Sequence, residues 1–291
     1  MVLGCIDIGS NTTRVLVAEA EGGRLREMLQ RRAFTRIGRG VKPGDEIPRS
    51  KIQEVAEVVA AHRALAEQAG ARPLRTVATA AIRGCANQRE FVAVLREVGG
   101  VDVDVLDGPE EARLAFLGAT RTLGQPLEGV IGVVDVGGGS TELAVGTLAG
   151  GVTWSESFRL GSGQLADAYL REDPPAAADL AAMRAHAGGA LEGIEIPRPD
   201  RAVAVGGSAA SLRRLVGGVL EPETMQRALR ELSAAPSGEV ARKFALDPER
   251  VRLLPAGILI LDAAAERLGC PLTIGRGGLR EGVLLELAAA A

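Results

Sequence analysis

Aromatic side chains are scarce in this sequence of 291 residues, where Phe, Tyr and Trp together make up 2%. Proteins that bind single-stranded nucleic acid generally stack bases on such side chains, so the scarcity argues against a nucleic-acid partner. The 46% of hydrophobic residues must therefore come mainly from aliphatic side chains. That amount is sufficient to fill the cores of two domains, which is also what the length suggests.

Histidine and cysteine are also rare. The only histidines, His62 and His186, are each isolated in a predicted helix, which argues against a histidine-based metal site and against a Ser-His-Asp triad. Cys5, Cys85 and Cys270 are far apart in the sequence, odd in number and set among apolar residues. This pattern is typical of reduced thiols in a core and excludes a disulfide framework.

Long apolar runs are also absent, since no run approaches the roughly 20 residues that a membrane-spanning helix needs. The N-terminus enters a predicted strand directly, without the basic segment of a signal peptide. We therefore expect a cytoplasmic protein with no membrane partner. The formal net charge is −3, and lysine occurs only at positions 42, 51 and 243. Arginine grips phosphate through a rigid fork, but base composition or thermal adaptation gives the same bias, so only local clusters of arginine carry a functional inference.

The sequence around Asp135 is the first candidate for a site. Residues 133–145 indicate a buried strand, a glycine-rich turn and a second strand. Glycines lack the Cβ atoms that keep a ligand away from the backbone, so the N–H groups of this turn can close on a phosphate. Asp135 lies at the carboxyl end of its strand, where open α/β sheets bind ligands. A plain β-hairpin with a glycine-rich loop is the alternative for this stretch taken alone.

A similar unit begins at Asp7, 128 residues earlier. The residues Asp7-Ile8-Gly9-Ser10-Asn11-Thr12 align with Asp135-Val136-Gly137-Gly138-Gly139-Ser140-Thr141, with one extra glycine in the second unit. An internal repeat of this size predicts two copies of one α/β unit that face each other across a cleft. Two aspartate-led phosphate turns would then meet in the middle.

Other segments place further polar residues near the same edge. Ser50 is expected to cap a helix over 51–70, and a strand over 74–79 leads to Arg83. Asp107 is expected to cap the next helix with Glu110 as its capping-box partner, which leaves Glu111 free. Glu111 alone is ambiguous, because glutamates in the first turn also complement the helix dipole.

Two more features extend this picture. The turn Gly206-Gly207-Ser208 follows a predicted strand and opens a helix, so its N–H groups are available to a phosphate or a sugar. Residues 24–42 carry seven cations and only Glu27 as an acid. This segment is either a solvated strand face with a mobile loop or an electrostatic funnel for an anionic chain.

Six motifs, in this order and spacing, resemble the exopolyphosphatase / guanosine pentaphosphate phosphohydrolase (Ppx/GppA) family over essentially the whole chain. They are Asp7-Ile-Gly-Ser-Asn-Thr12, Thr79-Ala-Ala-Ile-Arg83, Gly108-Pro-Glu-Glu-Ala-Arg113, Asp135-Val-Gly-Gly-Gly-Ser-Thr-Glu142, Gly206-Gly-Ser208 and Gly278-Leu-Arg-Glu-Gly282. The resemblance implies an α/β fold with two actin-like domains (ribonuclease H-like, of the sugar kinase/Hsp70/actin superfamily) around a central cleft. We expect them at 1–124 and 125–291, with the boundary at Gly124-Gln125-Pro126 and a helix at about 280–291 that packs back on the first domain.

The resemblance also implies roles by position. Glu111 and Glu142 would hold and deprotonate the attacking water, Asp135 and Asp7 would lie near a bound Mg²⁺ or Mn²⁺, and Arg83 would hold a substrate phosphate. The substrate-binding residues would be Gly9, Ser10, Asn11, Thr12, Gly138, Gly139, Ser140, Thr141, Gly206, Gly207 and Ser208.

The implied reaction is hydrolysis of the terminal phosphate of inorganic polyphosphate with release of orthophosphate. A pppGpp 5′-phosphohydrolase is the nearest alternative, because both substrates end in the same group. An actin-fold kinase is a further alternative, although paired glutamates suit water as the nucleophile. A non-enzymatic guanosine tetraphosphate sensor or a filament-forming actin homologue also stays open, as does a homodimer. Long family members carry an additional helical domain of the histidine–aspartate type. The two histidines of this chain are too few for such a domain, so the chain resembles the short, two-domain form.

Overall fold

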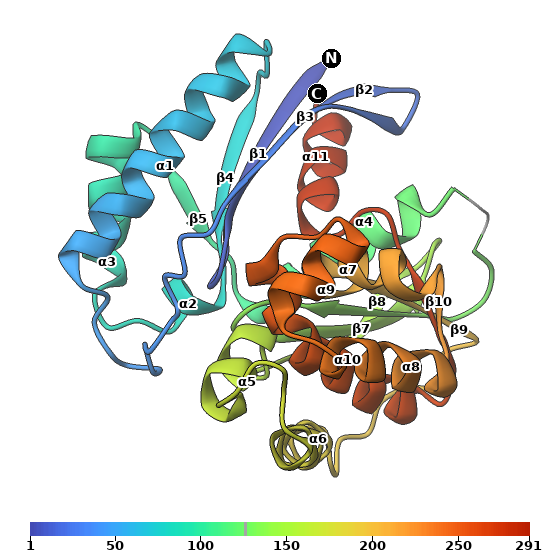
Figure 1. The fold of residues 1–291 in the computed structure, drawn as a ribbon. Coiled ribbons are helices and arrows are strands. Elements are labelled where there is room, and N and C mark those ends of the chain that lie inside the picture. Colours follow the sequence, from blue (N-terminus) through green and yellow to red (C-terminus); the bar gives the residue numbers. More distant parts are fainter. Residues whose placement is uncertain (125–126) are drawn as a thin grey trace.

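The structure is a computed structural model that describes residues 1–124 and 127–291. Two sheets lie in it, each with helices packed on both faces (Figure 1). The first part of the chain contains β1 (Val2–Ile8), β2 (Thr13–Glu21), β3 (Arg24–Ala33), α1 (Arg49–Gln68), β4 (Leu74–Ala78), α2 (Ala80–Arg83), α3 (Gln88–Val94), which continues into a π-helical turn (Leu95–Gly99), β5 (Val103–Val105) and α4 (Gly108–Thr122).

The second part is longer and more helical. It contains β6 (Ile131–Val136), β7 (Thr141–Thr147), β8 (Gly151–Phe158), α5 (Ser162–Tyr169), α6 (Ala177–Ala190), β9 (Arg201–Val205), α7 (Gly206–Val216), β10 (Val219–Leu220), α8 (Pro222–Ser233), α9 (Ser237–Phe244), α10 (Pro248–Leu268), β11 (Leu272–Ile274) and α11 (Leu279–Ala289). Within the described residues, no helix combines the length and the apolar character needed to cross a membrane.

Both sheets are built to one plan. The first has the order β3-β2-β1-β4-β5, in which β1, β2 and β3 form an antiparallel meander and β4 and β5 run parallel to β1. The second has the order β10-β11-β9-β6-β7-β8, in which β6, β7 and β8 form the meander and β9 and β11 run parallel to β6. The predicted internal repeat and the α/β fold class are therefore confirmed.

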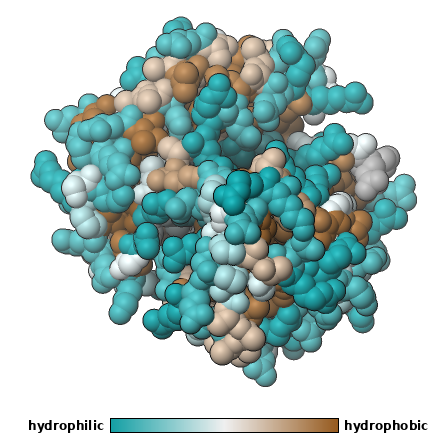
Figure 2. Space-filling model, viewed as in Figure 1, coloured by the Kyte–Doolittle hydropathy of each residue, from teal (hydrophilic) through white to brown (hydrophobic). Residues whose placement is uncertain are grey.

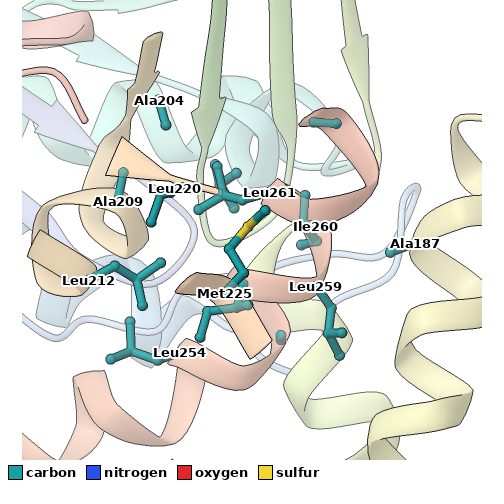
Figure 3. Packing of buried hydrophobic residues seen from close by; sticks show 14 of the residues in the cluster. Ala187, Ala204, Ala209, Leu212, Leu220, Met225, Leu254, Leu259, Ile260 and Leu261 are labelled. Atoms are coloured by element: carbon teal, nitrogen blue, oxygen red, sulfur yellow. The ribbon is translucent and has the colours of Figure 1, made fainter. Parts of the chain in front are cut away.

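Apolar side chains cover both faces of each sheet, which is why the helices lie where they do. On the outer face of the first sheet, Val55 of α1 and Phe91 of α3 are fully buried. On the outer face of the second sheet, the long helix α10 buries Leu254 and Leu261 among residues of α7 and α8, as Figure 3 shows. A core built in this way needs few aromatic residues.

Helices α4 and α11 lie between the two sheets. Phe116 of α4 packs on the second sheet, whereas Leu114 of the same helix packs with Val283 of α11 on the first. A Cβ atom on Gly118 would overlap the carbonyl oxygen of Gly278, and one on Gly282 would overlap that of Leu114. The two backbones are thus in direct contact, and only glycine fits at the crossing.

The C-terminal helix is therefore held against the first half of the chain. Its Glu286 accepts a hydrogen bond from Arg75 of β4 at 2.6 Å and also pairs with Arg113 of α4. The domain boundary predicted at Gly124-Gln125-Pro126 stays a prediction, because Gln125 and Pro126 lie outside the described residues.

Two predicted helix caps differ from the structure. Helix α1 begins at Arg49 after Pro48, so Ser50 lies inside the first turn and makes no capping bond. Asp107 caps α4 as expected, with its Oδ1 accepting from the Glu110 N–H at 2.8 Å. The Glu110 carboxylate, however, pairs with Arg113 at 2.7 Å instead of completing a capping box. A nearby guanidinium is a stronger donor to a carboxylate than a backbone N–H.

Candidate active site

Two turns face each other where β1 and β6 end. The Gly9 N–H donates to the Thr12 carbonyl at 3.0 Å, and the Gly137 N–H donates to the Ser140 carbonyl at 2.9 Å. Ile8 pairs with Thr13, and Val136 pairs with Thr141. The turns therefore have the same length, and the extra glycine assigned to the second turn is wrong. With the corrected alignment, Arg14 is the counterpart of Glu142, and each pairs across its hairpin with an aspartate.

The two turns touch. A Cβ atom on Gly138 would lie 2.9 Å from the Asn11 Cβ, and one on Gly139 would lie 3.0 Å from the Ser10 Cβ. Glycine in the second turn thus allows the halves of the molecule to meet. The N–H groups of residues 10–12 and 138–140 donate no hydrogen bond to any described residue. Such free N–H groups on paired turns are suited to bind phosphate oxygens.

A cleft of about 700 Å³ lies along these turns and between the two sheets. Most predicted site residues line it, namely Asp7, Gly9, Ser10, Asn11, Thr12, Glu111, Asp135, Gly138, Gly139, Ser140, Glu142, Gly206 and Gly207. Three do not. Thr141 is fully buried and donates to the Leu160 carbonyl at 2.5 Å, and Ser208 is buried against Gly257. The guanidinium of Arg83 is engaged with other protein groups.

Two buried glutamates approach each other across the cleft. Glu111 comes from the first turn of α4 and Glu142 from the second residue of β7, and they are 6% and 2% exposed. The pKa of Glu142 is raised to about 7 by burial and by the charge of Asp135, against hydrogen bonds from Ser140 and Ser157 that oppose the shift. Burial and the Glu142 charge raise the pKa of Glu111 well above its usual value, and Arg83 opposes this. Carboxylates with raised pKa values in a cleft are typical of general acid–base chemistry.

The guanidinium of Arg83 binds Glu111 and does not line the cleft. Its Nη1 donates to Glu111 Oε2 and to the Leu106 carbonyl, both at 2.8 Å. Its Nη2 lies 3.4 Å from the Ser157 hydroxyl. The predicted contact of Arg83 with substrate phosphate stays a prediction, and the structure adds a second role for its guanidinium, which is to hold Glu111.

The aspartates lie between the turns and a set of charged side chains. The pKa of Asp135 is raised to about 6 by burial and by the Asp7 charge, against the Arg14 cation that opposes the shift. Burial also raises the pKa of Asp7, again opposed by Arg14. No group of three or more His, Cys, Asp or Glu side chains in residues 1–124 and 127–291 is placed to hold a metal ion alone. Mg²⁺, however, is commonly held by one or two carboxylates with phosphate oxygens and water, so the pair of aspartates fits this ion.

Arginines gather farther along the cleft. A Cβ atom on Gly207 would lie 2.7 Å from Arg250 Nη1 and 2.9 Å from Arg14 Nη2, so two guanidinium groups converge over this glycine. The pKa of Arg250 is lowered to about 9 by burial and by the neighbouring cations Arg14 and Arg32. Burial and Arg280 lower the pKa of Arg14 to about 10. Both remain cationic at neutral pH.

Within the described residues these two arginines form no salt bridge, although the charges of Asp7 and Asp135 act on Arg14. Arg14 Nε donates to the Thr12 hydroxyl at 3.0 Å, whereas Arg250 Nε is buried without any hydrogen-bond partner. Two guanidinium groups held close together repel each other, and an added anion would relieve this repulsion. The arginine end of the cleft is therefore suited to bind an anion.

Sequence reasoning missed Arg14, Arg250, Arg280 and Ser157 as residues of the site. The sequence did contain a signal for Arg14, because aligning the two repeats without a gap places Arg14 at the position equivalent to Glu142. Arg280 stands in the motif 278–282, to which no role was given, whereas Arg250 lies in an unremarkable helix.

Of the cations in the segment 24–42, Arg31 and Arg32 line the cleft. Arg36 and Arg39 instead pair with Glu249 and Asp167 of the second half, at 2.7 and 4.0 Å.

Raised carboxyl pKa values predict how stability depends on pH in metal-free protein. A carboxyl group whose pKa is higher in the folded state stabilises the fold below its unfolded pKa, and this contribution is lost as the pH rises through the folded value. For Glu142 and Asp135 that window is about 4 to 7. We expect the free energy of unfolding in EDTA to fall by about 1–3 kcal/mol between about pH 5 and about pH 8, as measured by urea denaturation.

Glu142→Gln is the control for this prediction, because the amide cannot titrate, and its pH dependence should be smaller. The comparison is needed because burial lowers the pKa of His62, which shifts stability in the opposite direction. Identical pH profiles for the wild type and Glu142→Gln would contradict the assignment of the raised pKa to Glu142.

Comparison with known proteins agrees with the motifs. The model of the Ppx/GppA phosphatase family matches residues 16–291. The chain is 28% identical to Exopolyphosphatase 1 of Mycobacterium leprae, over 98% of this chain and 89% of that protein. It is also 28% identical to guanosine-5′-triphosphate,3′-diphosphate pyrophosphatase of Aeromonas hydrophila, over 97% of this chain and 58% of that protein.

A solved structure of a Ppx/GppA family member from Aquifex aeolicus has the same fold. It is 28% identical, the TM-score is 0.82, and the alignment covers 100% of this chain and 98% of the other. The two sheets thus belong to actin-like domains, as expected from the sequence. Because the family match spans nearly the whole sequence and the fold agrees, the chain belongs to the Ppx/GppA phosphatase family.

Proposed function

We propose that this chain is an exopolyphosphatase that hydrolyses the terminal phosphoanhydride bond of inorganic polyphosphate and releases orthophosphate. The observation that carries the proposal is the division of one cleft into an end with paired glutamates and an end where the guanidinium groups of Arg14 and Arg250 converge. No aromatic side chain occurs among the described residues that line the cleft. A linear polyanion suits such a cleft, whereas a nucleobase would find no ring to stack on.

The reaction needs a water molecule placed in line with the terminal phosphorus atom. Glu111 accepts a proton from this water, and Glu142 helps to hold it. The oxygen of the water then bonds to the terminal phosphorus, the bond to the bridging oxygen breaks, and the shortened chain keeps that oxygen. A base with a raised pKa is matched to proton transfer near neutral pH, and a base of this kind contributes about 10²–10⁴-fold in rate.

Phosphoryl transfer depends mainly on positioning and charge neutralisation. The free N–H groups of residues 10–12 and 138–140 bind the oxygens of the terminal phosphate. Asp7 and Asp135 would hold Mg²⁺ or Mn²⁺, which supplies positive charge to the phosphate oxygens when bound. Arg14 and Arg250 bind phosphates farther along the chain, where bidentate contacts fix its position.

A second candidate substrate is pppGpp. It ends in the same phosphoanhydride, and the relative from Aeromonas hydrophila carries the name of a guanosine-phosphate pyrophosphatase. The cleft also reaches Ala210, whose small side chain leaves room for a nucleoside.

Phosphate release decides between the two substrates. Purified protein is incubated with polyphosphates of several lengths or with pppGpp, in the presence of Mg²⁺ or of EDTA. No phosphoryl acceptor other than water is added. We expect metal-dependent release of orthophosphate, faster from polyphosphate than from pppGpp. Faster release from pppGpp would assign the second function, and no release from either substrate would overturn both.

Arg250→Met tests the anion site. The variant keeps the buried stem but removes the charge, so we expect KM for polyphosphate to rise about 10–100-fold, since charge-assisted hydrogen bonds are worth about 1.5–3 kcal/mol. The metal-free variant should be at least as stable as the wild type, because a repulsive pair has been removed. Arg227→Ala, on an exposed position of α8 outside the cleft, is the charge-matched control. An unchanged KM in Arg250→Met would remove Arg250 from substrate binding.

A further inference from the structure

We infer that Ser157 is a positioning residue of the proposed hydrolysis, which ties the two catalytic glutamates together across the halves of the molecule. The inference rests on the proposed function, because it concerns the same two carboxylates. Ser157 lies near the end of β8, at the edge of the second sheet. None of the six sequence motifs contains it.

The hydroxyl of Ser157 connects groups from both halves. Ser157 Oγ donates to Glu142 Oε1 at 2.8 Å. The same oxygen accepts from Arg83 Nη2 at 3.4 Å, and Arg83 Nη1 donates to Glu111 Oε2 at 2.8 Å. Glu111, Arg83, Ser157 and Glu142 thus form one continuous chain of hydrogen bonds.

The direction of these bonds follows from the chemistry of the groups. A guanidinium can only donate, so the Ser157 oxygen must accept from Arg83 and direct its single proton to Glu142. One oxygen of each glutamate is then held by the bridge. The other oxygen of Glu111 has no hydrogen-bond partner among residues 1–124 and 127–291, and it is therefore available to a water molecule. The bridge in this way sets the orientation of both carboxylates toward the cleft.

The backbone around Ser157 is built for this approach. A Cβ atom on Gly108, the first residue of α4, would lie only 2.6 Å from the Ser157 Cβ. Glycine at this position lets β8 come close to the start of the helix that carries Glu111. Two independent features, the hydrogen-bond chain and the close approach at Gly108, therefore bring Ser157 to the same place.

The test compares kinetics with stability. In Ser157→Ala we expect kcat for orthophosphate release to fall about 10–100-fold with KM changed less than about threefold, because the residue orients the base without touching substrate phosphate. Ser157→Cys keeps the shape of the side chain and supplies a weaker donor, so its kcat should lie between those of the wild type and Ser157→Ala. Gly108→Ala should lower kcat in the same manner by displacing β8.

Thr153→Ala is the matched control, since it removes another β8 hydroxyl, whose only hydrogen bond with the described part of the chain is to the Val145 carbonyl. A role in stability alone would lower Tm equally in both alanine variants and leave kcat unchanged, and that result would overturn the inference. A wild type that releases no orthophosphate would instead overturn the proposed function, and this inference with it. An active wild type with an equally active Ser157→Ala would refute this inference only.

Discussion

Replacing Glu111 by glutamine is expected to lower kcat for orthophosphate release roughly a thousandfold while polyphosphate still binds. The amide keeps the size of the side chain and can still accept from Arg83, but it cannot take a proton from water. Removing a negative charge from the cleft does not weaken its hold on an anionic substrate. The measurement pairs a phosphate-release assay with calorimetric binding of the same polyphosphate to the inactive variant.

Glu110→Gln is the matched control for this experiment. Glu110 is the preceding residue of the same helix, but its carboxylate faces Arg113 outside the cleft. Its loss should cost little activity, since a partly exposed ion pair contributes about 1 kcal/mol or less to stability. Activity of a folded Glu111→Gln variant within tenfold of the wild type would show that another group deprotonates the water.

Replacing Gly282 by alanine is expected to destabilise the protein by about 3 kcal/mol or more. Alanine is a better helix former than glycine by about 1 kcal/mol, so propensity alone predicts a gain. Here the added Cβ would overlap the carbonyl group of Leu114 in the facing helix. Neither backbone can yield without separating α4 from α11, so the steric term decides the sign. Urea denaturation measures the difference in free energy of unfolding.

Gly189→Ala provides the comparison, because Gly189 lies in the last turn of α6 with nothing within 4 Å of its added Cβ. That variant should be unchanged or more stable by up to about 1 kcal/mol. A Gly282→Ala variant as stable as Gly189→Ala would mean that the helices cross less closely than described. The Gly282→Ala variant should also lose activity, since α4 carries Glu111 and is displaced by the added Cβ.

The sequence predicted much of this arrangement because the information was local. The two aspartate turns, Glu111 in a first helical turn and Glu142 at a strand start are each defined by their immediate neighbours. Arg250 could not be found in this way, since its role depends on the fold bringing α10 over Gly207. The ion pair of Arg83 with Glu111 was not predicted, because the two residues lie in different helices and only the fold brings them together.

The surface of the molecule carries fewer indications of function than the cleft. Exposed large apolar side chains in the described part of the chain are Met1, Met28 and Val219, on separate strands or ends. Figure 2 shows one face of the molecule as mostly hydrophilic with small hydrophobic areas between. A homodimer therefore stays a prediction from the family resemblance.

The position of α11 has a consequence for the order in which the protein folds during synthesis. The chain begins with β1, and the N- and C-termini end near each other at the same side of the molecule (Figure 1). The inner face of β1 and β2 is covered by Leu279, Val283 and Leu284 of α11, which are synthesised long after both strands. A ribosome-bound chain therefore keeps this face bare until α11 has been made. A circular permutant that starts at α11 and continues into β1 would supply the cover first, and it should fold earlier on the ribosome.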